Sequence, residues 1–314
     1  MPCLIEASEC VVCDGSIEPL KRALVAPFLA ERIWKRKPFC VSLVKCRSCG
    51  FTFYNPRLDD ADLRNLYAGY RSDEYRNMRH STEPWYTRTF NADLASQANY
   101  AKRRARLAPI LKKHLGQRKI KRVLDHGGDH GDLVLGLIEG AEPFVFDISG
   151  APPTPGVRAT ADPAAIGADL IISSNVLEHV GFPRVLVADI LRAAPNNDGL
   201  IFLEVPCEIA TGASRIIRRI AQIGMMGAYR PLLVPYILRP AALYMMHEHI
   251  NYFIERSLTE LMRKCGASVI SSGTYFISAR MGSADVAWCL GRKERIPESN
   301  RGFFAFAESG SNDG

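Results

Sequence analysis

Four cysteines near the start of the chain occur in two closely spaced pairs. Cys10 and Cys13 form one Cys-x2-Cys pair, and Cys46 and Cys49 form the other. Each pair presents two thiolates on one tight turn, and two facing turns supply the four tetrahedral ligands that a structural Zn²⁺ prefers. We therefore predict a closed zinc site with no open position for catalysis. Two further thiols could each replace one of these ligands, Cys3 and Cys40.

A glycine-rich turn follows a predicted strand near the middle of the chain. Gly127, Gly128 and Gly131 allow the backbone to lie against a ligand, and many nucleotide-binding proteins share such a strand-to-helix turn. Asp147 follows the next predicted strand, where a carboxylate can accept hydrogen bonds from both ribose hydroxyls of a nucleoside. The alternative for Asp147 is an ordinary solvated side chain at the end of a strand.

A second polar cluster, His247-Glu248-His249, follows a long insertion and precedes a predicted helix. In an α/β sheet this position lies at the carboxyl edge, where ligands bind. His249 is the first choice for a general base, since an imidazole titrates near neutral pH. His247 and Glu248 are alternatives or orienting partners. The competing interpretation is structural, with these side chains holding a loop through hydrogen bonds.

Several short segments follow one another in an order typical of one family. They are Cys-Arg-Ser-Cys-Gly at 46–50, Phe-Tyr-Asn-Pro-Arg at 53–57, Leu-Asp-His-Gly-Gly at 124–128, Asn-Val-Leu-Glu-His-Val at 175–180 and His-Ile-Asn-Tyr-Phe at 249–253. Together they resemble the class I S-adenosylmethionine-dependent methyltransferases, especially the bacterial branch with an N-terminal four-cysteine zinc module. The resemblance extends from Cys10 to about Leu290.

This resemblance implies a Rossmann-like α/β fold and S-adenosylmethionine as the methyl donor. Asp125 and the 127–131 turn would hold the methionine part of the cofactor, and Asp147 would hold the ribose. Asn175 and Val176 would border the methionine and the sulfonium. The protein must also align the acceptor with the methyl group and remove a proton from a neutral acceptor.

The residue patterns divide the chain into four regions. We predict a zinc-binding module at 1–55, a helical connector or cap at 56–118, a catalytic core at 119–295 with an insertion at 207–246, and a partly disordered tail at 296–314. Apolar runs in the core predict strands at 122–125, 144–148, 169–174, 200–205, 268–272 and 286–290. Helical patterns lie at 132–139, 183–194 and 257–265. This alternation predicts a largely parallel sheet.

The composition of the chain bears on its partners and its cellular compartment. The 314 residues are 47% hydrophobic and carry a formal charge of +7, which permits a full core and slightly favours anionic partners. The first twenty residues lack the pattern of a secretion signal, and six of the nine cysteines cluster before residue 50, so we expect a reducing cytoplasm. The most apolar stretch, 231–246, is interrupted by Pro235, Arg239 and Pro240, which argues against a transmembrane helix.

The insertion at 207–246 is basic and apolar. Its arginines alternate with Ile, Met, Leu and Tyr; they are Arg215, Arg218, Arg219, Arg230 and Arg239. We favour a substrate lid packed on the core. The alternative is a segment that lies on an anionic membrane surface or closes over a lipid-linked substrate, which would place the protein at the inner face of the membrane.

The leading functional hypothesis is methyl transfer to oxygen or carbon of a sugar, a nucleotide-linked sugar or a surface glycan. An RNA methyltransferase is the first alternative, but the zinc region lacks the mixture of aromatic and basic residues typical of nucleic-acid surfaces, so nucleic acid is a disfavoured partner. The second alternative is a non-catalytic scaffold, suggested by the crowding of the glycine turn by His126, Asp129 and His130.

Overall fold

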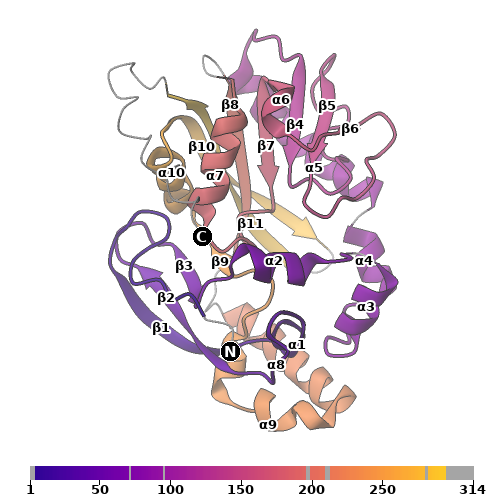
Figure 1. Cartoon of the computed structure of the whole chain (residues 1–314), viewed down its shortest axis with the longest axis vertical. Coiled ribbons are helices and arrows are strands. Elements are labelled where there is room, and N and C mark those ends of the chain that lie inside the picture. Colours follow the sequence, from indigo (N-terminus) through magenta and orange to yellow (C-terminus); the bar gives the residue numbers. More distant parts are fainter. Residues whose placement is uncertain are drawn as a thin grey trace, which may run out of the picture.

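A seven-stranded sheet forms the centre of the second half of the chain. The computed structural model describes residues 4–70, 72–94, 96–195, 199–208, 213–279 and 282–294. The strand order is β10-β11-β8-β7-β4-β5-β6 (Figure 1). The strands are β4 (Arg122–His126), β5 (Glu142–Phe146), β6 (Arg158–Ala159), β7 (Leu170–Ser174), β8 (Leu200–Cys207), β10 (Ala267–Ala279) and β11 (Gly282–Lys293).

The sheet is parallel except where β11 joins it. β4, β5, β6, β7 and β8 pair in parallel, whereas β11 runs antiparallel to both β8 and β10. Leu124 of β4 pairs with Phe144 of β5 and with Ile171 of β7, so these strands end at the same edge. The loops after β4, β5 and β7 therefore converge there. The predicted Rossmann-like α/β fold is confirmed.

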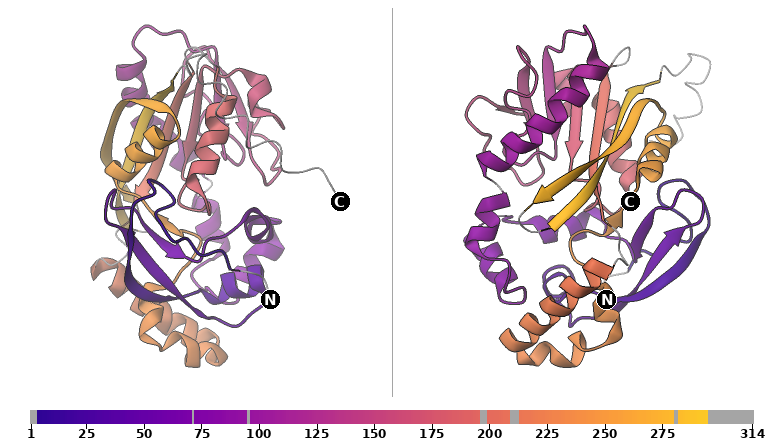
Figure 2. Two further views of the ribbon diagram at one scale, coloured as in Figure 1. Left: turned by 60° about the vertical axis from the view of Figure 1, so that its left-hand side comes forward. Right: turned by 180° about the vertical axis from the view of Figure 1, so that it is seen from behind.

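Helices cover both faces of this sheet, which makes three layers. Val123 and Leu170 contribute to an apolar cluster with α5 (Gln97–Leu115). Leu124 and Ile171 point to the other face and contribute to a cluster that includes α7 (Pro183–Ala193) and α10 (Glu255–Lys264). Figure 1 shows α7 and α10 in front of the sheet, and the right view of Figure 2 shows α5 across its other face. Burial on both faces explains why β7 begins with three consecutive apolar residues, Leu170 to Ile172.

The helix predicted at 132–139 is wrong. This segment forms a succession of turns between β4 and β5. Gly131, Gly136 and Gly140 have φ angles of 76°, 70° and 74°, in the left-handed region. An α-helix needs φ near −63° throughout, so left-handed glycines at this spacing leave no room for a regular helix.

A smaller antiparallel sheet stands beside the central one. Its order is β1-β2-β3-β9, with β1 (Ile17–Leu24), β2 (Cys40–Cys46), β3 (Thr52–Asn55) and β9 (Asn251–Tyr252). Its edge strand β9 comes from the second half of the chain and pairs with β3 through Phe53 and Thr52. Residues 1–55 therefore share a sheet with a segment that lies within the predicted core.

Short helices connect strands within each sheet and lead from the small sheet toward the central one. The N-terminal half contains α1 (Pro27–Trp34), α2 (Asp60–Tyr67), α3 (Asp73–His80) and α4 (Arg88–Leu94). Between β4 and β8 there is also α6 (Pro163–Ile166), where Asp162 caps the first turn through the amide of Ala164.

The segment between β8 and β9 is helical. It contains α8 (Ala213–Tyr229), the 3-10 turn η1 (Pro231–Leu233), α9 (Val234–Ile237) and the 3-10 turn η2 (Pro240–Tyr244). Figures 1 and 2 show α8 and α9 at the end of the molecule away from the seven-stranded sheet. Within the described ranges, no helix has both the length and the apolar character needed to cross a membrane. The predicted tail at 296–314 lies outside the described residues.

Candidate active site and cysteine cluster

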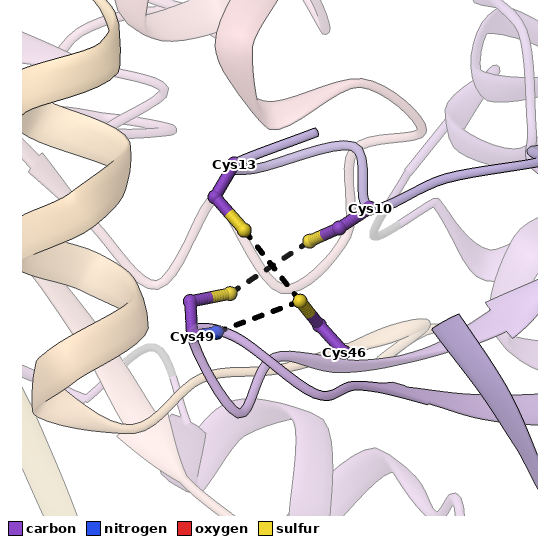
Figure 3. A group of neighbouring side chains, drawn as sticks. All are labelled: Cys10, Cys13, Cys46 and Cys49. Carbon is purple, nitrogen blue, oxygen red and sulfur yellow. Dashed lines mark hydrogen bonds between the residues drawn. The ribbon is translucent and has the colours of Figure 1, made fainter. Parts of the chain in front are cut away.

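The four predicted metal ligands come together in space. Cys10 and Cys13 lie on the turn before β1, and Cys46 and Cys49 lie on the turn between β2 and β3 (Figure 3). The Sγ atoms of Cys10 and Cys49 are 3.7 Å apart, and those of Cys13 and Cys46 are 3.5 Å apart. Sulfurs arranged tetrahedrally at about 2.3 Å from a zinc lie about 3.8 Å from one another, so the cluster fits the ion.

The backbone of the second turn is shaped for this cluster. Gly50 has a φ of 78°, and its amide donates to the carbonyl of Cys46 at 3.2 Å. The amide of Cys49 points at the Sγ of Cys46 at 3.5 Å. Cys40 does not belong to the group of four, and Cys3 lies outside the described residues.

The glycine-rich turn after β4 is closely packed. A Cβ atom added at Gly127 would meet Val176 at 2.7 Å, and one added at Gly128 would meet the carboxylate of Asp125 at 2.2 Å. A Cβ atom at Gly131 would meet Val157 at 2.7 Å. Glycine is thus required on steric grounds at all three predicted positions, and the turn presents bare backbone at the carboxyl edge of the sheet.

Two carboxylates flank this turn. Asp125, at the end of β4, is 2% exposed, and burial raises its pKa to about 7. Asp147 follows β5 and accepts hydrogen bonds from the backbone amides of Asp129 and Ser149, each at 2.8 Å. Each carboxylate oxygen has a second lone pair. Asp147 therefore braces the turn and still has acceptor capacity for the hydroxyls of a ribose.

The loop after β7 brings the glycine turn next to a polar cluster. Asn175 has a φ of 58°, and its amide donates to the carbonyl of Glu204 on β8 at 3.0 Å. This left-handed residue turns the chain so that Val176 lies against Gly127. Glu178 and His179 follow two and three residues later, so they lie close to the predicted cofactor turn.

A buried arginine holds the same loop. Arg57 is 1% exposed, and its guanidinium donates to the carbonyl of Gly181 at 2.8 Å, to that of Tyr54 at 2.7 Å and to Oδ1 of Asn251 at 2.5 Å. The Nδ2 of Asn251 donates to the carbonyls of Leu177 and Val180, both at 2.7 Å. This clamp joins three of the segments that carry the family resemblance, 53–57, 175–180 and 249–253.

Four side chains form what we term the acceptor cluster: Glu178, His179, Glu208 and His249. The Nδ1 of His249 and Oε1 of Glu208 are 3.1 Å apart, and the rings of His179 and His249 meet edge to face at 4.7 Å. The Nδ1 of His179 is 3.0 Å from the Tyr67 hydroxyl and 3.2 Å from the Glu248 carbonyl oxygen. The ligand-capable atoms of Glu178, His179 and His249 lie within 4.8 Å of one another.

Burial and charge give the members of this cluster different protonation behaviour. Burial raises the pKa of Glu178 to about 7, and its Oε2 has no hydrogen-bond partner among the described residues. Burial and the charge of His249 lower the pKa of His179 to about 3. Burial alone would lower the pKa of His249, but the Glu208 carboxylate raises it to about 9. Near neutral pH the cluster therefore combines a neutral imidazole, an imidazolium and a carboxyl group that can exchange a proton.

The other two predicted catalytic residues have their polar atoms engaged elsewhere. The Nδ1 of His247 is 2.8 Å from Oε1 of Glu83, and its Nε2 contacts Arg219. Glu248 accepts from the Tyr75 hydroxyl at 2.7 Å and pairs with Arg79 at 2.7 Å. These contacts fix the segment 247–249 from both sides, so that His249 points at Glu208.

Five residues of the site were not assigned a catalytic or binding role from the sequence, and two of them, Glu178 and His179, lie in the 175–180 segment that was noted only for its resemblance. Glu208 lies at the carboxyl end of β8, which is where the general rule for α/β sheets places ligand-binding residues, so that rule could have identified it. Arg57 belongs to a segment that was noted only for its resemblance. Tyr67 ends α2, and its sequence context carries no signal of a site.

A family model described as "Methyltransferase domain" matches residues 94–272. No curated protein sequence matches the chain. Three of the similar solved structures are methyltransferases with bound S-adenosylhomocysteine. The 1,6-didemethyltoxoflavin-N1-methyltransferase of Burkholderia thailandensis, with bound 1,6-didemethyltoxoflavin and S-adenosylhomocysteine, is 16% identical; the match covers 81% of this chain and 95% of that one, with a TM-score of 0.45.

The second is the magnesium protoporphyrin IX methyltransferase of Synechocystis, with bound S-adenosylhomocysteine. It is 14% identical over 74% of this chain and 93% of its own, with a TM-score of 0.39. The third, an N-methyltransferase of Bradyrhizobium japonicum in complex with S-adenosylhomocysteine, is 14% identical over 60% of this chain and 86% of its own, with a TM-score of 0.36.

Proposed function

The chain belongs to the methyltransferase domain family, and on that premise we propose that it transfers a methyl group from S-adenosylmethionine to a hydroxylated acceptor of the sugar class. The observation that carries the proposal is the contact between the glycine turn and the loop that bears the acceptor cluster. Through Gly127 and Val176, the predicted cofactor residues adjoin Glu178 and His249.

The cofactor supplies an activated methyl group on a sulfonium. The residues proposed to hold it are those at the carboxyl edge of the sheet. Backbone at Gly127, Gly128 and Gly131 would lie against it, Asp125 would bind the methionine part, and Asp147 would accept hydrogen bonds from the ribose. The left-handed turn at Asn175 and the side chain of Val176 would border the methionine and the reacting end.

The acceptor cluster would handle the acceptor's proton. A general base must be in its deprotonated form before it accepts a proton, and its ideal pKa lies near the operating pH. Glu178, with a pKa of about 7, meets this condition, whereas His249, with a pKa of about 9, is charged at neutral pH. We assign proton acceptance to Glu178, and to His249 the role of a cation that stabilises the negative charge developing on the acceptor. The sequence predicted His249 as the base, and in that case activity would rise through about pH 9.

The acceptor class follows from the chemistry of these side chains. A carboxyl group, two imidazoles and the Tyr67 hydroxyl lie together in this cluster. Such groups bind hydroxyls and carbonyls, and an apolar acceptor would leave the Oε2 of Glu178, which has no partner among the described residues, unpaired at a cost. A sugar, a nucleotide-linked sugar or a surface glycan, methylated at oxygen or at a carbon next to a carbonyl, fits this set.

We also propose that residues 1–55 form a structural zinc module, with 56–118 as connector and 119–295 as the catalytic core. The supporting observations are the spacings of the four sulfurs and the turns that carry them. Four thiolate ligands complete a tetrahedral zinc, so the ion would stabilise the module and would have no open position for substrate.

The test combines cofactor binding with turnover. Purified full-length protein is titrated with S-adenosylmethionine by calorimetry and then screened with sugar nucleotides for release of S-adenosylhomocysteine. Binding followed by product release with a sugar nucleotide supports the proposal. Binding with turnover only on an acceptor that lacks a sugar would overturn the acceptor class, and absence of binding would overturn the cofactor assignment.

A further inference from the structure

The segment between β8 and β9 exposes a row of large apolar side chains along α8, η1 and the end of α9. Ile217 is 69% exposed, and Leu232 and Leu238 are 86% and 72% exposed. The whole row, which we term the α8–α9 face, consists of Ile217, Ile220, Met225, Tyr229, Leu232 and Leu238. Scattered exposed apolar residues are normal, but a concentration on one short segment marks a surface that binds something apolar.

The opposite side of α8 is anchored to the rest of the protein. Arg215 contacts Glu208 and the Tyr252 hydroxyl, and Arg219 contacts His247 and the carbonyl of Met245. Met226, further along the same side, is 1% exposed. The helix is therefore held in place by its inner side, and the exposed row is a surface that these contacts leave uncovered.

The charges on this segment are all of one sign. Between Ala213 and Met246 the sequence contains five arginines and no aspartate, glutamate or lysine. Arg218, Arg230 and Arg239 are exposed on the same segment as the apolar row. Within the part of the chain that the structure describes, Arg218 and Arg230 form no ion pair. Unpaired guanidiniums beside exposed apolar side chains are the pattern of a helix that lies in an anionic membrane interface.

We propose that the α8–α9 face docks on a lipid bilayer with anionic headgroups. The apolar row would enter the boundary between headgroups and acyl chains, and the arginines would pair with lipid phosphates. A second copy of the chain fits this face less well. A two-fold interface places the same patch on both sides, so arginines would oppose arginines with no acidic residue of the segment to compensate them.

Docking through the α8–α9 face would bring the acceptor cluster close to the membrane surface. Arg215 on the inner side of α8 contacts Glu208, a member of that cluster. Glu208, beside the first turns of α8, thus lies about one helix diameter, roughly 10 Å, behind Ile217. The inference does not depend on the proposed methyl transfer, because membrane binding can be measured without an acceptor.

The experiment is vesicle co-sedimentation with the full-length protein. Vesicles of phosphatidylcholine alone are compared with vesicles that also contain phosphatidylglycerol. The wild-type protein is expected to bind the anionic vesicles and to remain in solution with the neutral ones. The double variant Ile217→Ser/Leu232→Ser and the double variant Arg218→Glu/Arg230→Glu are each expected to weaken binding by about tenfold or more.

Two matched controls distinguish docking from general adhesion. Val185→Ser removes an apolar side chain that is 57% exposed on α7, and Lys102→Glu/Lys113→Glu makes the same charge change on α5. Both are expected to bind like the wild type. Equal losses in the controls, or no binding of the wild type to anionic vesicles, would overturn the proposal. A wild-type dimer in solution that Leu232→Ser converts to a monomer would also overturn it, since a second copy would then cover the face.

Discussion

The guanidinium of Arg57 and the side-chain amide of Asn251 lie 2.5 Å apart across 194 residues of sequence. Asn251 is 2% exposed and also holds the loop that carries Glu178. One buried contact therefore connects the end of the small sheet with the loop beside the predicted cofactor. The position of the acceptor cluster depends on it.

Replacement of Arg57 by lysine is expected to destabilise the fold strongly. A lysine keeps the charge but cannot reproduce the planar fork that reaches Gly181, Tyr54 and Asn251 together. A buried acceptor that loses its donor costs about 1–3 kcal/mol, so a loss of at least about 2 kcal/mol is expected in the free energy of unfolding. Urea denaturation measures it, with the exposed Arg22→Lys as control. Equal stability of the two variants would show that the clamp contributes little.

Glu178→Gln is expected to reduce kcat and to leave cofactor affinity unchanged. The amide preserves the shape of the side chain but cannot accept the proton, and loss of a general base typically costs about 10²- to 10⁴-fold in rate. Single-turnover assays and calorimetry with S-adenosylmethionine separate the two quantities. Glu139→Gln, on an exposed turn, is the matched control. Full activity of Glu178→Gln would remove Glu178 from the proton-transfer role.

The pH dependence of kcat is expected to be bell-shaped. Activity should rise as Glu178 loses its proton near pH 7 and should fall as His249 loses its charge near pH 9. In Glu208→Gln the partner charge is absent, so the pKa of His249 should fall and the upper limb should move to lower pH. If His249 were the base, activity would instead rise through about pH 9.

The same imidazole should contribute to the pH dependence of stability. Its folded pKa of about 9 exceeds the ordinary value of 6.5. A group whose pKa is raised by folding stabilises the protein fully below its unfolded pKa, and this contribution is lost as pH rises through the folded value. Thermal denaturation of the wild type should thus show a larger decrease in Tm between pH 7 and pH 9 than that of Glu208→Gln. An identical decrease in Tm in both proteins would contradict the pairing of His249 with Glu208.

Gly128→Ala is expected to weaken cofactor binding. The added Cβ would lie 2.2 Å from the carboxylate carbon of Asp125, so the turn or the carboxylate must move. Overpacking of this kind costs about 1–3 kcal/mol, and because the cofactor would lie against the displaced backbone, a loss of affinity of about 5- to 150-fold is expected. Calorimetry with S-adenosylhomocysteine measures it. Gly224→Ala, where the new Cβ has open space, is the control. Unchanged affinity in Gly128→Ala would mean that the cofactor does not use this turn.

The purified protein is expected to contain about one zinc ion per chain. Cys46→Ser removes one of four ligands and should lower both the zinc content and Tm, because binding of a structural metal stabilises the fold. Elemental analysis and thermal denaturation provide the two readouts. Cys40→Ser removes a thiol outside the group of four and should change neither. Zinc retained at wild-type level in Cys46→Ser would contradict the assignment.

Local sequence patterns predicted the order and type of most core elements. The strands at β4, β7 and β8 and the helix α7 were found within one or two residues, because each is a buried or amphipathic run bounded by Gly, Pro or Asp. β5 begins and ends two residues earlier than predicted. β10 and β11 are much longer than the apolar runs at 268–272 and 286–290, since cross-strand pairing extends them through polar residues.

What the sequence could not predict depends on contacts between distant segments. The pairing of β9 with β3 involves only four residues, and no local pattern marks it. The partner of His249 is Glu208 and not its neighbour Glu248, because the backbone at 247–249 turns the two side chains toward different elements. Spacing alone suggests a cluster within His247-Glu248-His249, but it cannot distinguish the side chain that faces the site from those that brace it.

The edge strand β9 also bears on whether the amino-terminal portion of the chain can be separated from the rest. In a protein made of two independent domains, the chain can be cut between them, and each domain can be exchanged or expressed separately. Here the strand that completes the first sheet begins two residues after His249. Separating residues 1–55 from the rest of the chain would therefore remove the fourth strand of their sheet.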